Sequence, residues 1–358
     1  MPNSPYLPIF ELTRGKTVES IHYGAAAAVD VHGKLLAWYG DPQAVTFLRS
    51  TAKPFQALPF IEHDGHQIYG LSPKEIALMC ASHGGTDEHV AIARSIQSKC
   101  GVTESELLCG VHEPLDAATA QMLRERNEAP TPNRHNCSGK HSGMLAFVKI
   151  KRRAGETIPS ELPYIDPSHP IQREILHAFA DMCNLKAEQV ALGVDGCSAP
   201  NFAAPLQSAA LAYARLCDPE SGEVQPPKRA EACRVIVTAM MSHPEMVGGP
   251  GRFDTCLMQI AKGRIVSKEG AEAYQGLGLM PGALGPGSPA VGIAIKIADG
   301  DDRRIVREAV TLEILRQLGA LTESELEAMS AFGPQSPRFN WRKVVVGEAY
   351  PAFRLNWA

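Results

Sequence analysis

Runs of apolar residues near the N-terminal end of the chain have the short period that is typical of strands. Three apolar-rich or alternating runs lie between residues 8 and 40. The second covers Ile21 to Val31 and the third covers Leu35 to Tyr39, and the intervening His32-Gly33-Lys34 favours a hairpin turn. The pattern therefore predicts three neighbouring strands in this part of the chain.

The C-terminal end has a similar pattern, with one helix between its strands. The β-branched run from Ala290 to Ile297 stops at Asp299-Gly300-Asp301-Asp302, which is a strong turn signal. Apolar residues then recur at helical spacing from about Arg304 to Leu318, and Lys343 to Gly347 predicts one more short strand. Both ends of the chain are therefore expected to contribute strands.

The middle of the chain is predicted to be helical, with glycine and proline loops between the helices. The candidate helices cover residues 53–63, 74–82, 87–99, 116–126, 138–150, 170–184, 199–216 and 228–241. Strands at both ends with helices between them favour an α+β fold, in which the two chain ends together complete one antiparallel sheet. We therefore expect a single domain over residues 1–358, in which the helices within about 53–240 form a lobe.

Composition and charge narrow the classes of function. The chain has 358 residues, of which 44 % are hydrophobic, and its formal net charge is −4. Without a basic excess to neutralise phosphates, a general binder of nucleic acids or anionic membranes is not expected. The sequence has no run of about 18 apolar residues and no secretory signal pattern at its start. We therefore expect a cytoplasmic protein whose nine cysteines are thiols.

The pattern Ser50-x-x-Lys53 is the first candidate for chemistry. If it begins a helix, the two side chains lie one turn apart on the same face, where a neutral lysine can accept the serine proton. Pro54 supports a helix start, because proline is tolerated in the first helical turn and not deeper. The alternative is a chance match, because so short a pattern is common in long chains.

Three further clusters combine polar side chains with turn residues. They are Cys80-Ala81-Ser82-His83-Gly84-Gly85, residues 133–143 (NRHNCSGKHSG) and residues 193–200 (GVDGCSAP). The simpler alternative for the first is a helix C-cap, and for the second a solvated loop. Cys137 and Cys197 each precede a predicted helix and could meet to bind zinc, with Lys140 or a histidine completing the ligands. A lysine ligand would have to be neutral.

Taken together, these segments resemble the rhizobial-type L-asparaginases. The matching segments occur in the family's order, extend over most of the chain and are jointly specific, although each is weak alone. They are residues 48–56 (LRSTAKPFQ), 81–85 (ASHGG), 135–141 (HNCSGKH), 194–197 (VDGC), 252–255 (RFDT) and 268–272 (KEGAE). The resemblance implies hydrolysis of L-asparagine to L-aspartate and ammonia. It also implies a fold similar to serine β-lactamases and serine-dependent glutaminases.

The resemblance further implies two serine–lysine pairs as the catalytic residues. Ser50 corresponds to one serine, with Lys53 as its partner, and Ser82 corresponds to the other, with Lys268 as its lysine. Which serine attacks is open at this point. The helical spacing favours Ser50 as the nucleophile, with Ser82 relaying protons.

A metal site and a substrate site are implied in the same way. Cys137, Lys140 and Cys197 correspond to a metal site, usually zinc, with one ion per chain that would position substrate rather than activate water. The residues expected to bind substrate are Asp195 and His141 beside the metal, together with Arg49, His83 and Asn136 in the matched segments. A homodimer is expected on the resemblance alone.

Two other functions fit the same residues. A serine-dependent glutaminase or β-lactamase-like hydrolase would use the same scaffold, and one methylene of substrate length changes selectivity by only ~1–3 kcal/mol. A zinc-stabilised binding protein without catalysis would use the serines as helix caps. Such a protein would bind zinc and would release no ammonia from asparagine.

Overall fold

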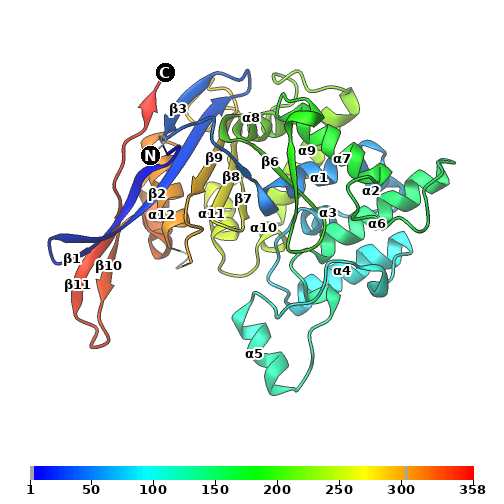
Figure 1. Cartoon of the computed structure of the whole chain (residues 1–358), viewed down its shortest axis with the longest axis horizontal. Coiled ribbons are helices and arrows are strands. Elements are labelled where there is room, and N and C mark those ends of the chain that lie inside the picture. Colours follow the sequence, from blue (N-terminus) through cyan, green and yellow to red (C-terminus); the bar gives the residue numbers. More distant parts are fainter. Residues whose placement is uncertain (1–3, 303–304) are drawn as a thin grey trace. The chain divides into compact units, whose positions relative to one another are not determined.

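The computed structural model describes residues 4–302 and 305–358. The chain divides into two compact units, which are described separately. The first unit comprises Met1–Thr51, Ala204–Gly222 and Ile260–Ala358, and the second comprises Ala52–Ala203 and Glu223–Gln259. The elements of both units can be followed in Figure 1.

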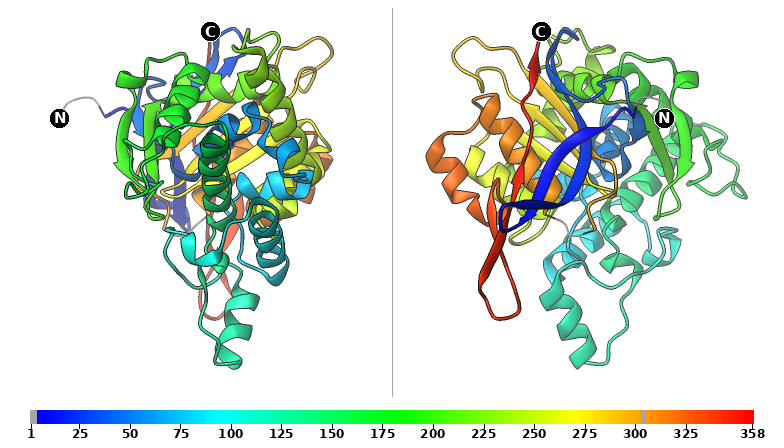
Figure 2. Two further views of the ribbon diagram at one scale, coloured as in Figure 1. Left: turned by 90° about the vertical axis from the view of Figure 1, so that its right-hand side faces the viewer. Right: turned by 60° about the vertical axis from the view of Figure 1, so that its left-hand side comes forward.

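The first unit is built on an antiparallel sheet with the strand order β10-β11-β1-β2-β9-β8-β7, and β3 pairs with both β2 and β12. The strands are β1 (Leu7–Arg14), β2 (Thr17–Asp30), β3 (Leu35–Tyr39), β7 (Ile265–Gly270), β8 (Tyr274–Leu279), β9 (Val291–Ile297), β10 (Ser336–Phe339), β11 (Val345–Pro351) and β12 (Asn356–Trp357). The N-terminal β1 pairs with the C-terminal β11, with Glu11 opposite Tyr350 (Figure 2). The predicted α+β class, with a sheet completed by both chain ends, is confirmed.

Small residues in the sheet allow the helix α8 (Leu206–Cys217) to pack closely on β2, β8 and β9. A Cβ atom on Gly292 of β9 would lie 1.7 Å from the Ala210 carbonyl oxygen, and one on Gly278 of β8 would lie 2.4 Å from Cys217 Sγ. Only glycine therefore fits at these positions. The unit also contains β4 (Val45–Phe47), α12 (Val306–Gln317) and α13 (Glu323–Ala328).

The second unit is mainly helical. Its helices are α1 (Lys53–Glu62), α2 (Gly65–Ile68), α3 (Pro73–Met79), α4 (Asp87–Cys100), α5 (Ala117–Glu125), α6 (Ser138–Arg153), α7 (Pro170–Met182), α9 (Pro227–Ser242) and α10 (Pro244–Val247), and α11 (Phe253–Ala261) begins in it. Residues 53–61 of α1 are all buried, because α6, α7 and α9 pack around this helix. The catalytic candidate Lys53 thus begins the central helix of the unit.

Two predicted helices differ from those observed. The candidate over residues 199–216 contains a strand, β6 (Pro200–Pro205), which pairs with β5 (Ala191–Val194), and the helix begins only at Leu206. Pairing across the tight turn at 195–199 satisfies backbone groups that a helix would otherwise use. The candidate over 74–82 ends at Met79, because the chain turns into the extended segment 81–85.

Other predictions from the sequence agree with the structure. The helix α12 follows the predicted span to Leu318 within one residue, although the predicted start at Arg304 lies outside the described residues. All nine cysteines are free thiols, and eight of them are buried. Within residues 4–302 and 305–358, no helix combines the length and apolar character that a membrane crossing needs.

Candidate active site

The second unit brings Lys53 and Ser82 together, although they are 29 residues apart in the sequence. Lys53 Nζ lies 2.9 Å from Ser82 Oγ and donates a hydrogen bond of 2.6 Å to the carbonyl oxygen of Ala81. Lys53 is 1 % exposed and Ser82 is 4 % exposed. The arrangement is a buried amine beside a hydroxyl, which is the geometry that a lysine base needs to activate a serine.

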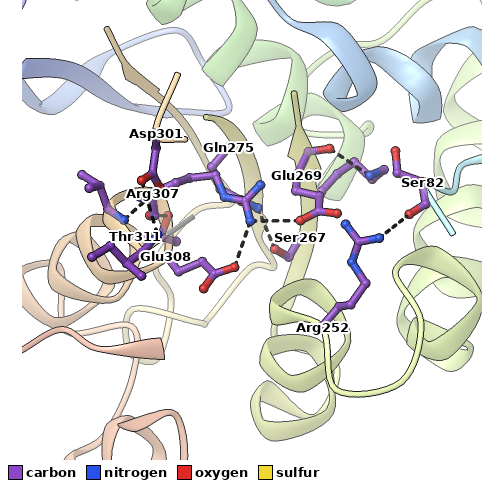
Figure 3. Close-up of polar contacts among 12 residues, drawn as sticks. Ser82, Arg252, Ser267, Glu269, Gln275, Asp301, Arg307, Glu308 and Thr311 are labelled. Atoms are coloured by element: carbon purple, nitrogen blue, oxygen red, sulfur yellow. Dashed lines mark hydrogen bonds and ion pairs between the residues drawn. The ribbon is translucent and has the colours of Figure 1, made fainter. Parts of the chain in front are cut away.

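Backbone contacts fix Ser82 in an extended segment after α3. The Ser82 N–H donates to the carbonyl oxygen of Val247 at the end of α10, over 3.0 Å. The Ser82 carbonyl oxygen accepts a hydrogen bond of 3.2 Å from Nη1 of Arg252 (Figure 3). Arg252 therefore places a positive charge next to the serine. The sequence matched the segment of Arg252 (RFDT) to the family but gave this arginine no role.

His83 is buried and makes both of its ring contacts within the protein. Its Nδ1 accepts from the Gly85 N–H over 3.1 Å, so its Nε2 carries the proton and donates to Ser138 Oγ over 2.9 Å. Burial and the neighbouring His89 and Lys53 hold the pKa of His83 well below its usual range. The geometry gives this histidine a structural position beside Ser82; its predicted contact with substrate stays a prediction.

The predicted metal ligands also meet in the second unit. Lys140 Nζ lies 2.9 Å from Cys197 Sγ, and Cys137 is in hydrogen-bonding contact with Cys197. The hydrogen bond from Cys197 holds the pKa of Cys137 well below its usual range, and Lys53 and Lys140 add to this effect against the opposing effect of burial. Burial lowers the pKa of Lys140, but Cys197 and Cys137 raise it by more, so the pKa of this lysine lies above its usual value. The lowered pKa of Cys137 and the raised pKa of Lys140 thus favour a thiolate paired with an ammonium group in this cluster.

The three other substrate-binding candidates of the second unit lie around this cluster. Asp195 is half-buried, and its carboxylate accepts from the Gly196 N–H over 2.9 Å and from Cys197 Sγ over 3.7 Å. Asn136 Oδ1 lies 3.3 Å from Cys137 Sγ. His141 is fully buried, and burial lowers its pKa to about 4.

Ser50, Arg49 and Lys268 belong to the first unit. Ser50 is buried in the short 3₁₀ helix Arg49–Ala52, and Arg49 has a positive φ of 53° and lies 3.7 Å from Glu272. The segment that carries Ser50 packs onto the end of β7: a Cβ atom on Gly270 would lie 2.7 Å from the Leu48 carbonyl oxygen. Ser50 and the strand of Lys268 are thus neighbours within this unit.

Lys268 is held on a strand that an ion pair anchors. Its Nζ donates to the Glu269 carbonyl oxygen over 2.9 Å, and the Glu269 carboxylate pairs with Arg307 of α12 over 2.9 Å (Figure 3). Arg307 also pairs with Glu308 over 3.1 Å, and Asp301 accepts from the N–H groups at the start of α12. These contacts fix the strand that carries the lysine.

In the described part of the chain, no group of three or more His, Cys, Asp or Glu side chains is arranged to hold a metal ion. The predicted ligand set is of another kind, because Lys140 is one of its three members. Zinc therefore stays a prediction at this point.

Stability should fall as the pH drops below about 6.5. Burial lowers the pKa of His135 to about 3 and of His141 to about 4, and it lowers that of His83 as well. Between these values and about 6.5, the unfolded chain binds protons that the folded protein excludes. Each step down in pH therefore lowers the free energy of unfolding, by roughly 1 kcal/mol per pH unit for each histidine.

Urea denaturation at pH 7.5 and pH 5.5 measures this dependence. The His83→Gln variant should lose less stability than the wild type over this interval. The matched variant His177→Gln changes an exposed histidine. It should lose as much stability between the two pH values as the wild type does. Equal stability of the wild type at the two pH values would contradict the prediction.

Comparison with solved structures finds glutaminases at low sequence identity. A probable glutaminase from Bacillus subtilis, complexed with 6-diazo-5-oxo-L-norleucine, is 12 % identical, with 78 % of each chain covered and a TM-score of 0.35. A Bacillus glutaminase in the presence of 4.3 M NaCl is 10 % identical, with 83 % of this chain and 91 % of that chain covered and a TM-score of 0.38. Comparison with curated protein sequences gives no match.

The family model of L-asparaginase II matches residues 10–351 of the chain. This range begins in β1, ends with β11 and includes every residue of both serine–lysine pairs and of the cysteine–lysine cluster. The match extends over nearly the whole sequence, including the helical second unit. We conclude that the chain is an amidohydrolase that belongs to the L-asparaginase II family.

Proposed function

We propose that the protein hydrolyses the side-chain amide of L-asparagine to give L-aspartate and ammonia, through a serine that Lys53 activates. The observation that carries this proposal is the buried contact of 2.9 Å between Lys53 Nζ and Ser82 Oγ. Membership of the L-asparaginase II family supports asparagine as the substrate.

Ser82 is the proposed nucleophile. A neutral lysine has two N–H groups and one lone pair, and the Ala81 carbonyl oxygen occupies one N–H of Lys53 at 2.6 Å. The lone pair is then available for the proton of Ser82. This assignment differs from the one that helical spacing favours, in which Ser50 attacks. Ser50 and Lys268, which the resemblance assigns to different pairs, would then form the second serine–lysine pair.

The proposed reaction proceeds in two displacements. Ser82 Oγ attacks the amide carbon while Lys53 takes the hydroxyl proton, and backbone N–H donors stabilise the oxyanion by roughly 3–4 kcal/mol each. The proton passes from Lys53 to the leaving nitrogen, the C–N bond breaks and ammonia departs. Water then attacks the β-aspartyl ester, with Lys53 as the base, and aspartate leaves. Because the base must be neutral, the rate should rise toward alkaline pH.

Charged groups of the second unit suit the two ends of an amino-acid substrate. The half-exposed Asp195 offers a negative charge for the α-ammonium group. Arg252, which hydrogen-bonds to the Ser82 carbonyl oxygen, offers a positive charge for the α-carboxylate. Arg49 and Asn136 remain proposed substrate-binding residues.

Zinc is the proposed cofactor of the cluster formed by Cys137, Lys140 and Cys197. Two sulfur donors and an amine in one buried cluster suit zinc, and the lowered pKa of Cys137 favours the thiolate that a metal requires. Lys140 would have to release its proton on binding. The ion would supply positive charge that orients substrate, and the nucleophile would still come from serine and lysine.

Ammonia release from L-asparagine tests the proposed function. The purified protein should hydrolyse L-asparagine with a kcat/KM at least about tenfold above that for L-glutamine, because an extra methylene misplaces the amide carbon. Coupled detection of ammonia with each substrate gives the ratio. No release from asparagine, or a ratio in favour of glutamine, would contradict the proposal.

The nucleophile can be identified by trapping the ester intermediate. After an acid quench during turnover, peptide mapping by mass spectrometry should find a β-aspartyl adduct on the peptide that contains Ser82. Ser82→Ala should abolish the adduct, and Ser50→Ala should leave it in place. An adduct on the Ser50 peptide would overturn the assignment while leaving the proposed substrate intact.

A further inference from the structure

Tyr164 lies outside every matched motif and contacts His141 in the interior of the second unit. The tyrosine is 6 % exposed, and its hydroxyl lies 2.7 Å from His141 Nδ1. The same hydroxyl oxygen accepts a hydrogen bond of 2.8 Å from the backbone N–H of Leu108. Tyr164 therefore links a loop backbone to the residue that follows Lys140 on α6.

These two contacts determine which ring nitrogen of His141 carries the proton. The Leu108 N–H can only donate, so it uses an acceptor site of the hydroxyl and leaves the hydroxyl proton for another group. His141 Nδ1 is the acceptor at hydrogen-bond distance, and leaving a buried O–H without an acceptor destabilises the fold. The hydroxyl therefore donates to Nδ1, and the ring proton resides on Nε2.

His141 lies beside the cysteine–lysine cluster, because it follows Lys140 on α6 and interacts electrostatically with Cys197. It is 0 % exposed, and among the described residues its Nε2 has no hydrogen-bond partner. A nitrogen that carries a proton has no lone pair for a metal ion.

We propose that Tyr164 is a positioning residue that locks His141 in the Nε2–H tautomer, so that neither ring nitrogen of His141 has a free lone pair for zinc and the histidine is excluded from the metal ligands. The inference deepens the proposed function and rests on it for the role of the cluster. It leaves the binding of zinc to Cys137, Lys140 and Cys197 and gives the imidazole of His141 a position beside these ligands.

Nitrogen-15 NMR of protein labelled at histidine tests the tautomer directly, without substrate or metal. The His141 signals are assigned by their loss in His141→Asn. In the wild type, Nδ1 should resonate in the unprotonated range and Nε2 in the protonated range. In Tyr164→Phe, both signals should move toward intermediate values, because the donor to Nδ1 is gone.

A second buried tyrosine provides the matched control. Tyr69 is 8 % exposed, and its hydroxyl has no hydrogen-bond partner in the described part of the chain, so Tyr69→Phe should leave the His141 signals unchanged. A protonated Nδ1 in the wild type would overturn the inference, as would equal spectra of wild type and Tyr164→Phe. If Tyr164→Phe does not fold, the wild-type spectrum still decides. Neither outcome depends on whether asparagine is hydrolysed.

Discussion

Replacing Lys53 by methionine is expected to lower kcat for L-asparagine by about 10²–10⁴-fold, which is the usual contribution of a general base. Methionine has a similar length and suits the buried environment of the 1 % exposed lysine, but it can accept no proton from Ser82. KM should change far less, because Lys53 acts on the serine and not on the substrate's charged groups. Steady-state kinetics with ammonia detection measures both constants.

A matched control and a rescue separate chemistry from structure. Lys151 is another buried lysine of the second unit, but its partners are the carboxylates of Glu156 and Glu174, so Lys151→Met should keep kcat within a few-fold. In Lys53→Ala, small primary amines should restore part of the activity, and the restored rate should rise with the fraction of neutral amine. A Lys53→Met protein that retains kcat within tenfold would contradict the assignment of Lys53 as the base.

The local sequence pattern predicted most elements of the fold but missed the strand β8, which lies between β9 and the edge strand β7. This strand has the sequence Tyr-Gln-Gly-Leu-Gly-Leu, and its two glycines weaken any strand signal. Those glycines are required by packing, since a Cβ atom on Gly276 or Gly278 would lie 2.3–2.4 Å from Tyr213 or Cys217 of α8. Both positions are therefore glycine because of a helix in another part of the chain, which a local pattern cannot reveal.

The candidate site shows the same division between local and distant information. Helical spacing correctly identified Lys53 as a residue at the start of a helix, and it paired this lysine with the nearest serine. The contact between Lys53 and Ser82 joins α1 to the segment after α3, and no spacing rule encodes it. Arg252 and Tyr164 were missed for a similar reason. Arg252 at least lay in a matched segment, whereas Tyr164 carried no signal.

The two cysteines were easier to place, because a shared residue type suggested that they would meet. Cys137 and Cys197 are 60 positions apart and both stand next to glycine or serine turns. The structure adds what the sequence lacked, namely the position of Lys140 at 2.9 Å from Cys197 and the contacts that lower the pKa of Cys137. The hydrogen bond from Cys197 and the lysine charges decide this chemistry, because burial alone would raise the pKa of the thiol and keep it protonated.

Changing Cys137 and Cys197 together to serine is expected to abolish zinc binding. The wild type should hold about one zinc per chain by elemental analysis, and a chelator should lower its melting temperature. If free zinc exceeds its dissociation constant about a thousandfold, the bound ion stabilises the fold by about 4 kcal/mol. That corresponds to a shift on the order of 10 °C. The double variant should contain no zinc, and its melting temperature should not respond to chelator.

The controls address the buried charge that the double variant leaves behind. In the double variant the ammonium group of Lys140 loses its thiolate partner and keeps only the weaker interaction with Asp195 among the charges named here, so this variant should also be less stable in the absence of metal. Lys140→Met removes that charge together with the amine ligand, and it should bind zinc weakly while folding normally. Cys100→Ser changes another buried thiol, at the end of α4, and should keep full zinc occupancy. Wild-type protein without zinc, or full occupancy in the double variant, would exclude this cluster as the metal site and leave the serine–lysine chemistry to act on its own.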